Sequence, residues 1–289
     1  MVVLNFNYGD SKIILLDNNQ IIIASVFQSI KYNNIIDENF LRHLVLNTYR
    51  MYRSRFKKKY GELIICNDST NYWRKEIFPL YKANRKRDMN KSDTDWGSIF
   101  SAMDNIRCEI KEVFPYKNIR VERTEADDII ATLCQEYYDK EKIIIISNDK
   151  DFQQLQILPN VEQYSPTKKK FLVCENPEEF LLNHIIKGDS SDGIPNILSD
   201  DDVFMIEDKR QTPCGMKKIS EITENIEEWK EKDNWKRNKK LIDMNEIPQE
   251  YREKIIDEFE TAVDNSRSNL LNYFIENKLK NLMTNIGDF

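Results

Sequence analysis

Three short apolar runs constrain the fold of this chain more than any other feature. They occupy residues 12–16, 62–66 and 142–146, and the acids that follow them are Asp17, Asp68 and Asp149. Continuous runs of Ile and Leu of this length are typical of strands that are buried on both faces of a parallel sheet. Each predicted strand therefore delivers a carboxylate close to its carboxyl end.

Helical patterns accompany these runs, at residues 40–60, 95–114 and 129–138. Strands that alternate with helices predict an α/β fold with a central, mostly parallel sheet flanked by helices. In such folds the ligand crevice lies outside the carboxyl ends of the strands, so the three acids should meet there. Strand signals fade near residue 181. We therefore predict an α/β domain at 1–180 and a smaller helical lobe at 181–289, packed together as one body.

Six further acids stand in short clusters that could join this crevice: Glu125, Asp127, Asp128, Asp151, Asp189 and Asp192. Local structure explains some of them, because Thr124 with Asp127 is close to a capping box and Asp192 precedes a glycine in a favourable turn. Nine carboxylates in one crevice would nevertheless repel one another, at roughly 3 kcal/mol for each pair about 6 Å apart. Such a cluster requires cations.

Hard divalent cations would relieve this repulsion. Mg²⁺ takes carboxylate, water and phosphate oxygens as ligands, so we predict a Mg²⁺ centre in which Mn²⁺ can substitute. Zinc is disfavoured, because the chain has only two histidines, His43 and His184, and no cysteine is paired with them. His43 lies in an amphipathic helical pattern and is expected to be structural. Two clustered ions would support in-line hydrolysis of a phosphodiester.

A basic and aromatic segment follows the second predicted strand. Its candidate contacts with nucleic acid are Tyr72, Arg74, Lys75, Lys82, Arg85, Lys86 and Arg87. Cations interleaved with aromatic rings can grip phosphates and stack on unpaired bases. Lys82 and Arg85 are three positions apart, so on a helix they would share a face and point to one scissile phosphate. The alternative is a solvated helix face with Trp73 turned to the core. The lysines at 168–170 fit a hairpin edge better than a binding site.

The overall charge and the missing motifs narrow the function further. The formal net charge is −6, but setting nine clustered acids aside leaves +3, so a nucleic-acid partner is not excluded. The sequence contains no P-loop and no G-x-S-x-G motif, which argues against a nucleotide-driven motor and a serine hydrolase. The five cysteines form no C-x-x-C pair, and no apolar run reaches the roughly 18 residues of a membrane span. We expect a cytoplasmic monomer.

The order and spacing of these motifs resemble those of the metal-dependent 5′-nucleases of the flap endonuclease family. The matching segments are Leu15-Leu16-Asp17, Asn67-Asp68, Tyr72-Trp73-Arg74, Tyr81-Lys82-Ala83-Asn84-Arg85, Glu125-Ala126-Asp127-Asp128, Ser147-Asn148-Asp149-Lys150-Asp151-Phe152 and Lys187-Gly188-Asp189-Ser190-Ser191-Asp192. The resemblance implies a PIN-like nuclease core with a basic arch at about residues 70–97. It also implies a variant of the helix-hairpin-helix motif in the C-terminal lobe.

By this resemblance, seven acids surround two Mg²⁺ ions and two more complete the second site. The seven are Asp17, Asp68, Glu125, Asp127, Asp128, Asp149 and Asp151, and the two are Asp189 and Asp192. Lys82 would be the catalytic lysine of the arch, with Arg85 beside it on the phosphate. The implied activity is 5′ to 3′ exonuclease and flap endonuclease cleavage of RNA primers in RNA–DNA hybrids, and of adjacent DNA, during phage DNA replication.

One segment departs from the family pattern. Family members carry a Gly-x-Gly hairpin after the last acidic pair, which can hold a potassium ion, whereas residues 194–202 contain no glycine and three aspartates. Side chains and carboxylates there would hinder the approach of duplex phosphates, so we expect no potassium site. Duplex contacts would then shift to Lys209, Arg210, Lys217 and Lys218.

Two other functions compete with the nuclease. A non-catalytic protein that binds replication forks would have missing or substituted ligands, yet all nine acids are present. A phosphate-accepting receiver domain would be shorter and would not need the additional acid clusters. The resemblance suggests a sliding clamp and a single-strand DNA-binding protein as partners. The apolar tips at residues 1–6 or 286–289 could dock such partners or pack on the chain itself.

Overall fold

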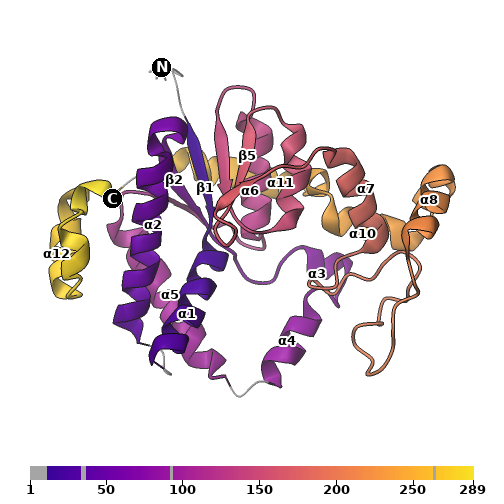
Figure 1. The fold of residues 1–289 in the computed structure, drawn as a ribbon, viewed down its shortest axis with the longest axis horizontal. Helices are drawn as coiled ribbons and strands as arrows, with labels where there is room; N and C mark the ends of the chain where they lie inside the picture. The colour runs from indigo at the N-terminus through magenta and orange to yellow at the C-terminus, as the bar shows by residue number, and fades with distance from the viewer. Residues whose placement is uncertain (1–11, 34–36, 92–93, 263–264) are drawn as a thin grey trace.

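The computed structural model describes residues 12–33, 37–91, 94–262 and 265–289, and Figure 1 shows their arrangement. A six-stranded sheet runs through the molecule. Its strands are β1 (Ile13–Asp17), β2 (Glu62–Cys66), β3 (Lys117–Ile119), β4 (Ile143–Ile146), β5 (Val161–Ser165) and β6 (Lys170–Leu172). Their order is β3-β2-β1-β4-β5-β6, and each neighbouring pair is parallel except β5 with β6. The predicted, mostly parallel sheet is confirmed.

The three predicted strands form β1, β2 and β4, with bounds within one residue of those expected. Ile13 of β1 lies opposite Glu62 of β2 on one side and Ile143 of β4 on the other, so the three strands end at the same level. The order of the strands reverses direction at β1. This reversal creates a topological switch point at the carboxyl ends of β1 and β4, where α/β proteins bind their ligands.

The central strands are buried on both faces, which explains their uninterrupted apolar sequences. Ile14 and Leu16 belong to one hydrophobic core, and Ile13 and Leu15 belong to the other. The helices over the first core are α1 (Asn18–Asn33), α2 (Glu38–Tyr60), α5 (Trp96–Val113) and α12 (Leu270–Glu276). The helices over the second are α6 (Ala126–Tyr137) and α11 (Gln249–Thr261). The predicted helical patterns correspond to α2, α5 and α6.

A third core connects the basic segment with helices from the second half of the chain. Phe78 and Tyr81 pack there with α7 (Pro177–Lys187), α8 (Met216–Glu224) and α10 (Asp233–Ile242). The remaining elements are α3 (Arg74–Ile77), α4 (Ala83–Asn90), α9 (Ile226–Lys230), α13 (Lys280–Met283), η1 (Lys150–Ile157), η2 (Met244–Glu246), η3 (Arg267–Asn269) and η4 (Ile286–Asp288). Along the chain α3 and α4 come between β2 and α5, where the sequence predicts the arch, and Figure 1 shows them on the side of α10, away from α5.

The helices after residue 181 are divided among the three cores. α8 and α10 belong to the third core, whereas α11 packs on α6 and α12 lies on the first core. Phe289 is fully buried there, with its ring centroid 5.2 Å from that of Phe274. The tip at 286–289 therefore packs on the chain itself, and residues 1–6 lie outside the described residues. Within the described part of the chain, no helix combines the length and apolarity that a membrane crossing needs.

A glycine ends α7 just before the last acidic pair. Gly188 has φ +67° and ψ −171°, a conformation essentially restricted to glycine, and an added Cβ would lie 2.4 Å from the carbonyl oxygens of Ile194 and Pro195. We expect Gly188→Ala to lower the free energy of unfolding by at least about 2 kcal/mol, measured by urea denaturation. Gly287→Ala is the control, because no atom lies within 4 Å of its Cβ position. Equal losses in the two variants would contradict this explanation.

Candidate metal centre

The carboxyl ends of β1, β2 and β4 surround an open cleft with a volume of about 360 Å³. The predicted site residues that line it are Asp17, Asp68, Asp127, Asp149, Lys82 and Arg85. Asp127 comes from the first turn of α6, and Lys82 directly precedes α4. The structure therefore brings the strand-end acids together with one acid of the 125–128 cluster and both predicted catalytic cations.

Asp17 lies at the centre of this arrangement, at the end of the middle strand. Ser147 Oγ donates a hydrogen bond to its Oδ2 at 2.9 Å, and the amide of Gln20 donates to its Oδ1 at 3.3 Å. Burial, together with the negative charges of Asp68 and Asp149, raises the pKa of Asp17 to about 7 despite these hydrogen bonds. The carboxylate is thus fixed in position but costly to ionise without a cation.

The other acids of the cleft show the same excess of negative charge. Burial and the charge of Glu125 raise the pKa of Asp68, although the amide of Ala126 donates to its Oδ1 at 2.7 Å. Burial and the charge of Asp149 raise the pKa of Asp127 well above its usual value. Burial also raises the pKa of Asp149 itself. A hard divalent cation with oxygen ligands would fit this donor set and favour the ionised carboxylates.

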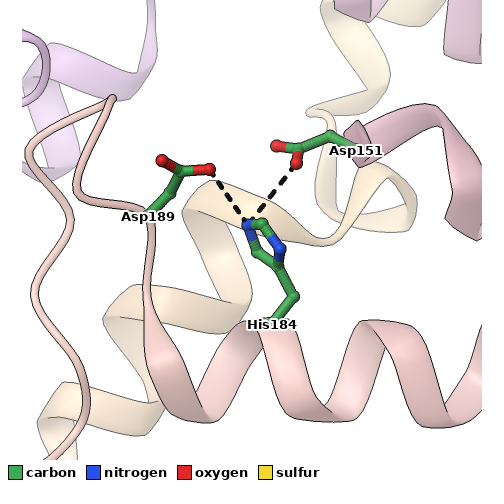
Figure 2. A group of neighbouring side chains, drawn as sticks. All are labelled: Asp151, His184 and Asp189. Carbon is green, nitrogen blue, oxygen red and sulfur yellow. Dashed lines mark ion pairs between the residues drawn. The ribbon is translucent and has the colours of Figure 1, made fainter. Parts of the chain in front are cut away.

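Asp151 belongs to a second group, shown with His184 and Asp189 in Figure 2. One ligand atom from each residue lies within 4.8 Å of the other two. Asp151 Oδ1 and His184 Nε2 are both buried without a hydrogen-bond partner. Burial raises the pKa of Asp151 to about 7; His184 opposes this effect, and the charges of Asp149 and Asp189 add to it. Because these two atoms lack a hydrogen bond and face each other only at ion-pair distance, 3.5 Å, this group is a second candidate place for a cation.

Lys82 and Arg85 lie among the acids. Lys82 has a left-handed backbone at φ +57°, which is costly for a residue with a Cβ, and its Nζ pairs with Glu125 and, at 3.6 Å, with Asp192. The guanidinium of Arg85 also pairs with Asp192. The hydroxyl of Tyr81 lies 2.9 Å from Glu125 Oε2 and 3.1 Å from Asp192 Oδ2. These contacts join the basic segment to the acid cluster at 125–128 and to the acid pair at 189 and 192.

The backbone of the loop that carries Asp192 also holds the basic segment. The donors are the amide of Lys82, Nδ2 of Asn84 and Nε of Arg85, and the acceptors are the carbonyl oxygens of Asp192, Ser190 and Ser191, at 2.7, 2.8 and 3.0 Å respectively. Gly193 permits this close approach, because a Cβ there would lie 3.1 Å from Asn84 Oδ1. The position of the predicted catalytic cations is therefore set by the same loop as that of Asp192.

Asp128 and Arg74 are buried against each other, whereas the sequence predicts a metal ligand and a nucleic-acid contact at these positions. Asp128 is fully buried and closes a capping box, with its Oδ2 accepting from the amide of Glu125 at 2.9 Å. Arg74 is 5% exposed, and its Nη1 lies 3.0 Å from Glu125 Oε2 and 2.8 Å from Asp128 Oδ1. Arg74 is thus a buried partner of two acids and not a surface contact for nucleic acid. The helix cap is at Glu125, one residue later than the expected cap at Thr124.

The other cations of the basic segment are closer to the surface. Lys75 and Lys86 are exposed, and Tyr72 is partly buried. Arg87 is partly exposed and donates from Nη1 to the carbonyl oxygen of Phe204 at 2.5 Å. Apart from Arg74, the side chains predicted to contact nucleic acid in this segment therefore remain at least partly accessible to a ligand.

Four cations are predicted to replace the missing glycine hairpin, and their environments differ. Arg210 and Lys217 are exposed. Lys209 pairs with two of the three aspartates at 200–202, and Lys218 pairs with a glutamate one helical turn later, at 3.1 Å. Within this set, the positive charges of Lys209 and Lys218 are offset by nearby carboxylates, so Arg210 and Lys217 are the better placed to meet a phosphate.

The sequence pattern does not point to two residues of the site. His184 enters it only as one of two histidines, too few to favour zinc, although it stands in the last turn of α7, five residues before Asp189. The last turn of a helix lies close to the residues that follow it, and this spacing could have pointed to the contact. Tyr81 appears in the basic segment as an aromatic residue, but nothing in its position indicated that its hydroxyl reaches two acids.

Comparison with known proteins identifies the family. Residues 12–181 match the family described as 5′-3′ exonuclease, N-terminal resolvase-like domain. The chain belongs to the 5′-3′ exonuclease family. Residues 176–289 match a second family, T4 RNase H, C terminal.

Relatives of this 5′-3′ exonuclease family member include a phage enzyme that matches along nearly the whole chain. It is ribonuclease H of Enterobacteria phage T4, which is 29% identical over 96% of this chain and 95% of its own length. The 5′-3′ exonuclease of Buchnera aphidicola subsp. Schizaphis graminum is 28% identical over 64% of this chain and 65% of its own length.

Solved structures from bacteriophage T5 share the fold. A flap endonuclease complex with DNA and metal ions superposes with a TM-score of 0.63 at 17% identity, covering 86% of this chain and 99% of that chain. A 5′-exonuclease with bound zinc gives a TM-score of 0.60 at 18% identity, covering 86% and 98%. These likenesses confirm the predicted α/β nuclease fold.

The buried position of Arg74 predicts a structural role. We expect Arg74→Met to lower the free energy of unfolding by about 3 kcal/mol or more, because Glu125 and Asp128 would be left as buried, unpaired carboxylates. Urea denaturation followed by circular dichroism measures this change. Lys75→Met is the control, since Lys75 is the exposed neighbour on α3 and its loss should stay within about 0.5 kcal/mol. A similar cost for both variants would argue against the internal ion pair.

The raised carboxyl pKa values predict a pH-dependent response to Mg²⁺. Asp17 and Asp151 have pKa values of about 7 in the folded protein against an ordinary 3.8. Their contribution to stability is therefore complete below about pH 4 and is lost as pH rises through about 7. Mg²⁺ should raise the melting temperature by at least about 3 °C more at pH 8 than at pH 5.5, measured by differential scanning fluorimetry.

Two variants test the origin of this response. Asp149→Asn removes one carboxylate of the cleft and should reduce the Mg²⁺-dependent rise at pH 8. Asp139→Asn removes an exposed carboxylate from the surface and should leave the rise unchanged. A Mg²⁺ response that is equal at both pH values would contradict the account.

Proposed function

We propose that this protein is a Mg²⁺-dependent 5′-nuclease that removes RNA primers from RNA–DNA hybrids, together with adjacent DNA or flaps, during phage DNA replication. The observation that carries the proposal is the gathering of acids from β1, β2 and β4 around one cleft that Lys82 and Arg85 also line. The similarity to phage T4 ribonuclease H, at 29% identity over 96% of the chain, supports the substrate class. The cytoplasmic location, the monomeric state and the clamp and single-strand-binding partners remain predictions.

The proposed ligands fall into two groups. At the cleft they are Asp17, Asp68, Asp127 and Asp149, to which we add the buried Glu125. At the second position they are Asp151 and Asp189, to which we add Asp192 from the same loop as Asp189. We assign Asp128 to the scaffold, because it pairs with Arg74. Two bound Mg²⁺ ions would lower the pKa of an attacking water and stabilise the leaving oxygen of the phosphodiester.

The cationic side chains would position the scissile phosphate. Lys82 and Arg85 line the cleft with the acids, so a phosphate that enters it meets both positive charges. The backbone of Lys82 is anchored to Asp192, and Tyr81 spans Glu125 and Asp192. The backbone is therefore already in place, and only the side chains of Lys82 and Arg85 exchange a carboxylate partner for the phosphate. The exposed cations of the basic segment would hold the nucleic-acid backbone through contacts that weaken with salt.

Cleavage of a labelled hybrid tests the proposal directly. With Mg²⁺, the purified protein should release short fragments from an RNA strand that is labelled at its 5′ end and paired with DNA. Asp149→Asn should slow this release at least about 100-fold through the loss of a metal ligand, while the hybrid still binds. Gel electrophoresis measures the fragments, and fluorescence anisotropy measures binding.

The exposed Asp139→Asn variant serves as the control and should cleave like the unmodified protein. Tight binding of forked or hybrid nucleic acid without cleavage under either Mg²⁺ or Mn²⁺ would overturn the nuclease proposal. That result would favour the non-catalytic fork-binding protein.

A further inference from the structure

We propose that His184 is a metal ligand, and that it forms with Asp151 and Asp189 a site of one nitrogen and two oxygen donors. Such a site would bind a divalent transition ion in preference to Mg²⁺. The inference rests on the proposed metal-dependent function, and it assigns a role to a side chain that the carboxylate ligand set does not include.

The spacing of the donor atoms supports a shared ion. Nε2 of His184 lies 3.3 Å from Asp189 Oδ2 and 3.5 Å from Asp151 Oδ1. Donors that stand about 2.1 Å from one ion, in tetrahedral or octahedral arrangement, are separated from each other by about 3.0 to 3.5 Å. Figure 2 shows the ring nitrogen directed between the two carboxylates, which come from η1 and from the loop after α7.

Burial makes these atoms more than a chance cluster of acids. His184 is 7% exposed, and its Nε2 has no hydrogen-bond partner among the described residues. Asp151 Oδ1 is likewise buried and without a hydrogen bond. A buried polar atom that lacks a partner costs about 1 to 3 kcal/mol. A single cation bound between the two atoms would satisfy both, and at Asp189 Oδ2 it would take the place of Lys150 Nζ, which lies 3.0 Å away.

The surroundings of His184 fix its backbone and pack against its ring. The backbone carbonyl of His184 accepts a hydrogen bond from the amide of Gly188 at 2.8 Å, which fixes the last turn of α7. The ring of Phe180, one turn earlier on the same helix, lies 5.7 Å from the ring of His184 between centroids. The backbone of His184 is therefore fixed and its ring is packed on one side, which limits the rearrangement needed to bind an ion.

A nitrogen donor changes the selectivity of the site. Carboxylate and water oxygens suit Mg²⁺, whereas imidazole favours transition ions in an affinity order that rises from Mn²⁺ through Co²⁺. The proposed ligands at the cleft are all carboxylates, in contrast to the group around His184. The two positions would then differ in preference, with Mg²⁺ favoured at the cleft and a transition ion favoured beside His184.

Pulsed electron paramagnetic resonance on the full chain with bound Mn²⁺ tests the assignment. The chain has only two histidines, so labelling with nitrogen-15 histidine marks His184 and His43 alone. We expect a nitrogen coupling to Mn²⁺ that changes on labelling. It should persist in His43→Asn, the matched control on α2, and should disappear in His184→Asn.

Calorimetry provides the second measurement. His184→Asn should weaken Mn²⁺ binding at least about tenfold and change Mg²⁺ binding much less. A protonated histidine that merely pairs with the two aspartates would give bound Mn²⁺ without nitrogen coupling, and that result overturns the inference while leaving the nuclease proposal intact. A protein that binds neither Mn²⁺ nor Mg²⁺ overturns both. The labelled, unmodified protein decides the question even if the variant fails to fold.

Discussion

Repulsion among buried carboxylates is the constraint on which the rest of this structure depends. Parallel strands that end at one level bring Asp17, Asp68 and Asp149 to the same edge of the sheet, and α6 adds further acids from its first turn. Partial burial weakens the screening of these charges by water, so their pKa values rise together. The surrounding cations, the capping interactions and the proposed metal sites can all be understood as responses to this repulsion.

Positively charged side chains offset this repulsion in two ways, one in the interior and one at the cleft. Deep in the protein, Arg74 is committed to Glu125 and Asp128 and forms part of the scaffold. At the cleft, Lys82 and Arg85 also pair with acids, but the open space beside them admits a ligand. The difference is one of access: an enclosed ion pair stabilises the position of α6, whereas an accessible one can exchange a carboxylate partner for a phosphate.

Much of the fold could be predicted because the strands that position the site are buried on both faces. Their apolar runs indicated the sheet, which the structure confirms, and the acids after them do line one cleft at the carboxyl ends of the strands. Contacts between side chains that are far apart in the sequence could not be predicted in this way. The sequence around Arg74 indicates a surface cation, but the structure shows its contact with Asp128. His184 has no metal-binding partner near it in the sequence, but α7 places it beside Asp151. The return of Phe289 to the first core likewise depends on tertiary packing alone.

The hydrogen bond between the Lys82 amide and the Asp192 carbonyl has a thermodynamic consequence. It ties the segment that would meet the substrate to the loop that carries one of the second group of acids. Thermodynamic linkage is reciprocal, so any effect that ion binding has on the affinity for a nucleic-acid end is matched by an equal effect of that end on the affinity for ions. The shared hydrogen bond is the physical route by which one such event would be felt at the other position.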